Sequence, residues 1–164
     1  MKTHNISASY TEYDNIEELT SEDRDLVLAA REAAAGAYAP YSKFRVGAAV
    51  RLDKGTIVKG ANVENAAYPS GICAERNALA NCVTNFPDEK AVAIAIAAFT
   101  QDGAADDSVS PCGMCRQVIA EEEFRNHRKI KILLSGSQRV RIIETMKDLL
   151  PLQFNKGNLR IDHP

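Results

Sequence analysis

Apolar positions recur at helical spacing early in the chain, after a polar stretch over residues 1–19 that has no clear period. Thr20 can cap a helix, and the acids Glu22 and Asp23 suit a first turn because they face the positive end of the helix dipole. The apolar stripe that follows consists of Val27, Ala30, Ala34 and Tyr38. Pro40 predicts the end of this helix. We expect residues 1–19 to form a flexible N-terminal extension.

Apolar segments farther along the chain predict five strands. Residues 44–52 and 56–64 flank a turn that contains Gly55, which is typical of a hairpin. Residues 91–99 are nine apolar residues in a row, the pattern of a strand that is covered on both faces. Two shorter segments predict the remaining strands, 130–135 and 139–143.

Helices are predicted between these strands. One begins near Cys73 and another near Cys112, and a short third helix over 144–150 ends before Pro151. The side chains expected to face the core are Leu79, Cys82 and Val83 on the first helix and Val118 and Ile119 on the second. This order of helices and strands is that of an α/β protein with helices on the faces of a sheet, so we expect a single domain over 20–164.

Composition narrows the class of protein. A length of 164 residues suits one domain, and 45% hydrophobic with 26% charged residues is typical of a globular chain. The formal net charge of −2 gives no sign of a nucleic-acid-binding surface. No apolar run approaches the ~20 residues of a membrane span, and the polar N-terminus lacks the apolar core of a signal peptide. We therefore expect a cytoplasmic protein with reduced thiols and no membrane or nucleic-acid partner.

The cysteines are the candidate metal ligands of the sequence. Cys73, Cys112 and Cys115 supply three thiols, which is the ligand number of a catalytic zinc site with one open position. A redox pair or a purely structural zinc site is the alternative. A structural site needs four ligands, and the remaining cysteine, Cys82, lies on the apolar face of a helix, where we expect it to be core. One Zn²⁺ per subunit is the prediction.

Two charged residues stand beside the first ligand. Glu75 follows Cys73 by two residues, where a carboxyl group can move protons to and from a metal-activated water. The alternative is a solvated helix glutamate. Three thiolates around Zn²⁺ sum to a negative charge, so Arg76 and the two helix N-termini are expected to offset it from outside the ligand shell.

Several motifs together resemble a known family. They are Cys73-Ala-Glu75 with Pro111-Cys-Gly-Met-Cys115, Tyr38-Ala-Pro-Tyr-Ser42, Asn62-Val-Glu-Asn65 and Leu149-Leu-Pro151 with Phe154. The first pair is the signature of zinc deaminases. The whole set, from about residue 38 to 154, resembles the cytidine deaminases of the short, three-cysteine type. This resemblance implies a three-layer α/β/α fold with a five-stranded mixed sheet, and a homotetramer with shared active sites.

The resemblance also implies a reaction and a set of substrate contacts. The reaction is hydrolytic deamination of cytidine and 2′-deoxycytidine to the uridine products and ammonia, by attack of zinc-bound hydroxide at C4, as a step of pyrimidine salvage. Glu75 is the implied proton shuttle. Asn62 and Glu64, two apart on the predicted strand 56–64, are expected to face the same side and to bind a sugar hydroxyl. The remaining implied substrate contacts are Ala74 and, from a neighbouring subunit, Phe154. Phe44 is a further candidate, which either packs against the pyrimidine or is a core phenylalanine.

Three rival functions remain open at this point. A deaminase of another aminopyrimidine would share the zinc motifs, although the Asn62 and Glu64 pair favours a nucleoside. A nucleic-acid-editing deaminase would use the basic run over 125–131, which has no interleaved aromatic residues and suits a solvated helix end. A zinc-stabilised interaction domain would have no need of Glu75.

Overall fold

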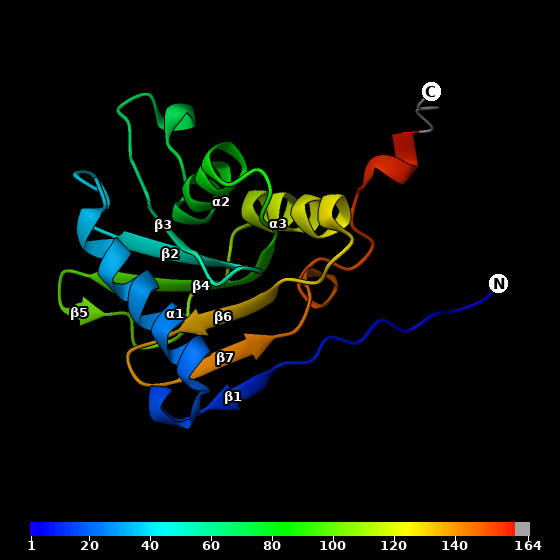
Figure 1. Cartoon of the computed structure of the whole chain (residues 1–164), viewed down its shortest axis with the longest axis horizontal. Helices are drawn as coiled ribbons and strands as arrows, with labels where there is room; N and C mark the ends of the chain where they lie inside the picture. The colour runs from blue at the N-terminus through cyan, green and yellow to red at the C-terminus, as the bar shows by residue number, and fades with distance from the viewer. Residues whose placement is uncertain (160–164) are drawn as a thin grey trace.

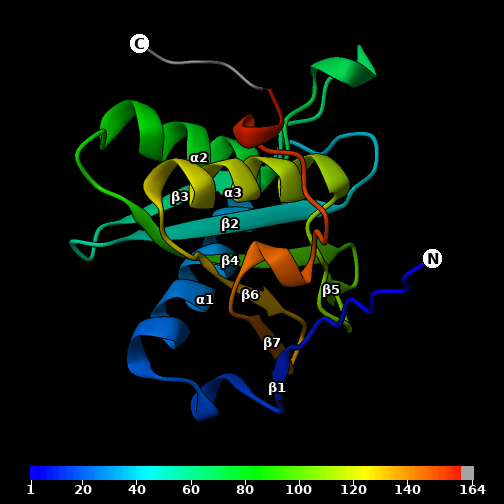
Figure 2. The same ribbon diagram turned by 90° about the vertical axis from the view of Figure 1, so that its right-hand side faces the viewer.

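The computed structural model describes residues 1–159 and shows three layers (Figure 1). Helix α1 covers one face of a mixed sheet, and α2 and α3 lie side by side on the other face (Figure 2). The strand order is β1-β7-β6-β4-β2-β3, with β5 paired to β4. The helices are α1 (Ser21–Ala33), α2 (Ala74–Asn85) and α3 (Gly113–Asn126). The strands are β1 (Thr11–Tyr13), β2 (Arg45–Leu52), β3 (Ile57–Ala61), β4 (Ala91–Thr100), β5 (Gly103–Ala104), β6 (Lys131–Ser135) and β7 (Val140–Ile143).

Strand β4 is the centre of the sheet, as its unbroken apolar run predicts. It pairs in antiparallel fashion with β2 and in parallel with β6, and residues 93–98 are all buried. Alternate side chains enter two separate cores. Ile94 and Ile96 pack under α2 and α3, whereas Ala93 and Ala95 face α1. The small side chains on the second face allow α1 to lie close to the sheet.

Two glycines bring helices into direct contact with strands. A Cβ on Gly47 of β2 would lie 2.1 Å from the carbonyl oxygen of Ala30 in α1. A Cβ on Gly60 of β3 would lie 2.4 Å from the backbone nitrogen of Ala78 and 2.7 Å from the carbonyl oxygen of Ala74, both in α2. All three distances are far below a van der Waals contact, so only glycine permits this packing. The contact at Gly60 sets the position of the first turn of α2.

The sheet has seven strands rather than the expected five. The added strands are β1, which pairs with β7, and β5, which pairs with the end of β4. The N-terminal segment is therefore part of the fold from residue 11 onward, and Leu19 is buried in the core under α1. Residues 1–10 are exposed. The boundary at residue 20 stays a prediction, and residues 160–164 of the expected domain lie outside the described residues.

Other sequence predictions differ from the structure in detail. Helix α1 gives way to a 3-10 turn after Ala33, so Tyr38 is exposed rather than part of the apolar stripe. Strand β3 ends at Ala61, and Val63 makes only isolated bridges. Val83 is exposed, and the short helix expected over 144–150 is a 3-10 turn at Met146–Asp148. No helix within residues 1–159 is long and apolar enough to cross a membrane.

Candidate metal centre

Three thiols meet where two helices begin. Cys73 is the N-cap of α2 and Cys112 is the N-cap of α3, so both precede free backbone N–H groups, while Cys115 follows in the first turn of α3. The three sulfur atoms lie within 4.8 Å of one another, and the sulfurs of Cys112 and Cys115 are 3.5 Å apart. The structure therefore brings together all three cysteines that the sequence predicts as ligands.

This sulfur triangle fits zinc. A Zn–S bond of ~2.3 Å with tetrahedral angles places sulfur atoms about 3.8 Å apart, within the range that the three cysteines span. Cys115 is buried, Cys73 is half-buried and Cys112 is exposed, so solvent reaches the cluster on the side of Cys112. Cys82 is 5% exposed and packs in the core under α2 and α3, as expected.

The thiols differ in acidity because their surroundings differ. Burial raises the pKa of Cys73 and of Cys115, and the nearby carboxyl group of Glu75 adds to both shifts. Burial also acts on Cys112, but hydrogen bonds from the backbone N–H groups of Cys115 and Met114 hold the pKa of Cys112 below its usual value. A buried thiol that resists ionisation in the free chain becomes a thiolate when a dication binds.

Glu75 lies in the first turn of α2 and is buried, with 5% of its surface exposed. Burial raises the pKa of its carboxyl group, while its own backbone N–H and the Cys115 thiol oppose that shift. This is not the environment of a solvated helix glutamate. A carboxyl group that holds its proton more readily beside a metal site is suited to accept a proton and to deliver it again near neutral pH.

The side chains of Asn62 and Glu64 form hydrogen bonds with residues of one segment of the chain. The side-chain oxygen of Asn62 accepts from the Val46 N–H at 2.7 Å, and its NH₂ group donates to the Phe44 carbonyl at 3.0 Å. Both residues follow β3 rather than lying within it. The Glu64 carboxylate accepts from the backbone N–H of Tyr41 and from the hydroxyl of Ser42. These bonds order residues 38–46 beside the start of β2.

The other expected site residues occupy different surroundings. Phe44 is half-buried in the loop that Asn62 braces, and Ala74 is fully buried at the start of α2. Phe154 is 57% exposed. Arg76 is half-buried and makes no hydrogen bond or ion pair within residues 1–159, so its expected contact with the sulfurs stays a prediction.

Sequence reasoning missed the two residues that follow Cys115. The Arg116 guanidinium donates to the Pro111 carbonyl and to the Leu149 carbonyl, each at 2.8 Å. Gln117 donates to the Phe154 carbonyl at 2.9 Å. Together they join the ligand turn of α3 to the C-terminal tail. Their position directly after the ligand was the only signal, and it does not reveal partners more than thirty residues away.

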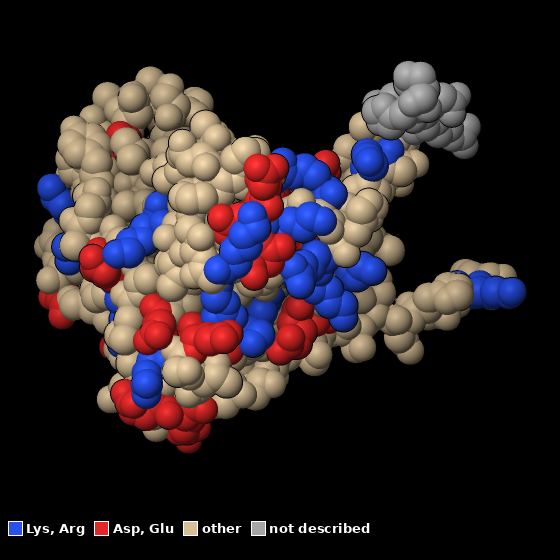
Figure 3. Space-filling view, viewed as in Figure 1, with Lys and Arg blue, Asp and Glu red and all other residues tan. Residues whose placement is uncertain are grey.

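Three basic residues of the run over 125–131 pair with acids in the structure. Arg125 contacts Glu122, and Lys131 contacts the buried Asp23. Arg128 lies 3.3 Å from Asp53. On the face drawn in Figure 3, basic and acidic residues are interspersed.

Comparisons with known proteins agree with this site. The family model described as the cytidine and deoxycytidylate deaminase zinc-binding region matches residues 20–129. A cytidine deaminase of Sporosarcina psychrophila is 40% identical over 82% of this chain and 92% of its own length. One of Mycobacterium tuberculosis is 38% identical over 79% of this chain and 87% of its own.

Solved structures show the same likeness in three dimensions. The crystal structure of cytidine deaminase from Burkholderia pseudomallei matches with a TM-score of 0.70 and 36% identity, over 83% of this chain and all of that one. The structure from Mycobacterium tuberculosis matches with a TM-score of 0.63 and 32% identity, over 83% and 99% of the two chains. With its three-thiol cluster and buried glutamate, this chain belongs to the cytidine deaminase family of zinc-binding hydrolases.

Proposed function

We propose that this protein hydrolyses cytidine and 2′-deoxycytidine to the corresponding uridine nucleosides and ammonia. The observation that carries the proposal is the buried carboxyl group of Glu75 beside three thiols at zinc-ligand spacing. The family membership of the chain supports the same reaction. An interaction domain that merely contains zinc has no use for a buried proton carrier, so the arrangement favours catalysis.

The proposed role of each group in the reaction follows from its chemistry. Cys73, Cys112 and Cys115 would hold the zinc ion, which would supply a water molecule of lowered pKa and so a nucleophile near neutral pH. Glu75 accepts the proton that this water gives up. It then donates a proton to N3 of the pyrimidine ring and assists the departure of the amino group as ammonia. Its raised pKa suits both directions of proton transfer.

The nucleoside is expected to bind against the loop 38–46. Asn62 and Glu64 lie against this loop, and their polar groups are the proposed contacts for a ribose hydroxyl. The Phe44 ring is the proposed apolar contact for the pyrimidine. The backbone at Ala74, at the start of α2 beside Cys73, is the proposed reader of the base edge. A substrate without the sugar would lose the Asn62 and Glu64 contacts.

We also propose that the protein acts as a homotetramer. Large apolar side chains are exposed on segments near the metal centre, among them Met114 beside the ligands, Tyr68 in the loop before α2 and Phe154 on the tail. The part of Figure 3 that corresponds to α2 and this loop carries few charges. Burial of these side chains by neighbouring copies would remove apolar surface from water and close the sites. Cytoplasmic location remains a prediction of the sequence.

The decisive experiment measures ammonia release from cytidine by the zinc-loaded protein. The Glu75→Gln variant removes the proton carrier but keeps the shape of the side chain. We expect it to lose turnover by at least about 100-fold, because general acid–base catalysis contributes 10²–10⁴-fold. Zinc content should stay at the wild-type level.

The outcomes separate the rival functions. No ammonia from cytidine, with release from another aminopyrimidine, would replace the nucleoside as substrate. Unchanged behaviour of Glu75→Gln, with no release from any aminopyrimidine, would leave a zinc-stabilised interaction domain.

A further inference from the structure

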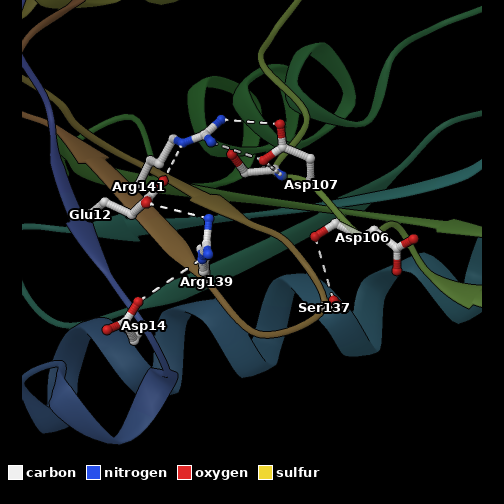
Figure 4. Close-up of polar contacts among 8 residues, drawn as sticks. Glu12, Asp14, Asp106, Asp107, Ser137, Arg139 and Arg141 are labelled. Carbon is white, nitrogen blue, oxygen red and sulfur yellow. Dashed lines mark hydrogen bonds and ion pairs between the residues drawn. The ribbon is translucent and has the colours of Figure 1, made fainter.

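The N-terminal segment reaches a loop that leads to the metal ligands. Residues 1–19 precede the region that the family model matches. Nevertheless, β1 pairs with β7 so that Glu12 lies opposite Arg141. The Arg141 side chain connects Glu12 on one side with Asp107 on the other (Figure 4). Asp107 belongs to the stretch 105–112, which has no regular structure and ends at the ligand Cys112.

The contacts in this chain of residues are short. The Arg141 Nε donates to the Glu12 carboxylate at 2.7 Å, and the Arg141 guanidinium lies 3.0 Å from the Asp107 carboxylate. The Tyr10 ring centroid lies 5.6 Å from the Arg141 guanidinium carbon. Arg139 adds a weaker contact with Glu12, at 3.7 Å. Glu12 and Tyr10 therefore hold the Arg141 side chain from the N-terminal side, in the orientation that meets Asp107.

The loop is also confined from the direction of the sheet. Gly136, at the end of β6, packs against it so closely that a Cβ would lie 3.1 Å from the Asp106 carbonyl oxygen. Arg31 of α1 donates to the Gly136 carbonyl at 3.0 Å. This hydrogen bond helps to fix Gly136 in the position where it packs against the loop. The Asp107 side chain is 74% exposed, so its contact with Arg141 supplies an anchor that burial does not. The loop 105–110 is thus clamped between the sheet end and the charged side chains of β7.

We propose that β1 is a positioning element for the metal centre. Glu12 orients Arg141, Arg141 anchors Asp107, and the anchored loop delivers Pro111 and Cys112 to the position at which Cys112 meets Cys73 and Cys115. Glu12 acts through these residues and touches neither metal nor substrate. The inference deepens the proposed function, because it assigns the N-terminal segment a role in holding the zinc ligand that is exposed to solvent.

The test compares two variants that each remove one carboxylate from the N-terminal segment. Glu12→Gln removes the charge that pairs closely with Arg141 and more weakly with Arg139. Glu17→Gln breaks the contact of Glu17 with Arg24, 2.8 Å long, which does not reach the loop. Two quantities are measured on the full chain: the rate of zinc transfer to an excess of a coloured chelator, and hydrogen exchange of the backbone amides over 104–110.

Glu12→Gln should release zinc about two- to five-fold faster and raise exchange over 104–110 by a similar factor, as expected for loss of one partly exposed ion pair. Asp107→Asn should have the same effect. The double variant should be no worse than either single variant, because both break one connected path. Glu17→Gln should match the wild type, and amides of β4 should exchange alike in the wild type and all four variants.

Three results would overturn the proposal: equal behaviour of Glu12→Gln and Glu17→Gln, additive effects in the double variant, or faster exchange spread evenly over β4. Amide exchange requires neither substrate nor zinc. It therefore still tests the clamp if the protein fails to release ammonia from cytidine, and failure of the proposed function stays distinguishable from failure of this inference.

Discussion

At the scale of single residues, two buried cysteines of different role provide a matched pair. Cys115 is fully buried and lies at the metal centre, whereas Cys82 is 5% exposed and packs in the core. Cys115→Ser should weaken zinc binding by more than about 100-fold, since loss of even an outer partner of a ligand costs 10–100-fold. Cys82→Ser should keep zinc and lower the free energy of unfolding by about 1–3 kcal/mol, because a hydroxyl replaces a thiol in an apolar site. Zinc titration and thermal unfolding measure the two effects. Equal zinc affinity in the two variants would remove Cys115 from the ligand set.

The metal ligands were the most predictable residues of the site. Zinc accepts few side chains, and its three thiols lie on two short segments whose spacing is visible in the sequence. The bonds of Asn62 and Glu64 were not predictable in the same way. Their partners belong to the loop 38–46, so a strand pattern over 56–64 indicates the side they face but not what they hold. Arg116 was missed for the same reason, because Leu149 is distant in sequence.

At the scale of elements, the contact between β3 and α2 determines where Cys73 and Glu75 lie. A methyl group on Gly60 would meet the backbone of Ala74 and Ala78, which cannot move without shifting the helix. Gly60→Ala should therefore lower the free energy of unfolding by about 1–3 kcal/mol and should reduce both zinc affinity and turnover. Gly36→Ala is the control, since nothing lies within 4 Å of a Cβ at Gly36. If the two variants were equally stable and active, the strand would not position this helix.

Helix α1 is joined to the sheet by a buried acid, and this predicts a dependence of stability on pH. Asp23 lies 3.1 Å from the Arg51 side chain and 2.9 Å from the Lys131 side chain. Burial alone would raise the pKa of Asp23, but the hydrogen bonds and charges of Lys131 and Arg51 outweigh it and hold the pKa below its usual value of 3.8. A carboxyl group with a lowered folded-state pKa stabilises the fold above pH ~4 and loses that contribution as the pH falls through the folded-state pKa.

Asp23→Asn should accordingly lower the free energy of unfolding at pH 7 by about 1–3 kcal/mol, the range for a hydrogen bond to a charged group. Below pH ~4 the difference between the variant and the wild type should shrink. Glu32→Gln, which removes the exposed contact of Glu32 with Lys59, should cost less than about 1 kcal/mol at either pH. Denaturant unfolding at several pH values measures these differences. The prediction would be contradicted if the difference in unfolding free energy between Asp23→Asn and the wild type became larger in acid.

Long periodic elements were predictable, and short ones were not. The nine apolar residues over 91–99 became β4, and the helices after Cys73 and Cys112 begin at Ala74 and Gly113. Strand β1 has three residues and β5 has two, too few for an alternation to stand out from chance. Strand β1 pairs with β7, which is distant in the sequence, and β5 pairs with the end of β4 across a tight turn. The expected five-stranded sheet was wrong because it lacked these two short strands.

At the scale of the whole molecule, the single chain leaves Phe154 on the surface although Gln117 holds its backbone near the ligand turn. An exposed aromatic ring on an anchored tail suits contact with another copy of the chain. Phe154→Ala should therefore raise KM for cytidine without changing zinc content. The proposed tetramer should appear in sedimentation equilibrium of the wild type, since in that proposal it is assembly that would place the ring in a neighbour's site.

Mixing two impaired variants separates contact between subunits from contact within one. Glu75→Gln supplies an intact Phe154 but no proton carrier, and Phe154→Ala supplies an intact Glu75. When the two chains are expressed together, the proposed mixed tetramers would contain sites in which Glu75 of one subunit meets Phe154 of its neighbour. Activity at low cytidine concentration should then exceed the sum of the two separate variants. If Phe154 instead serves the site of its own chain, no mixed site contains both residues, and activity would equal the average of the two variants.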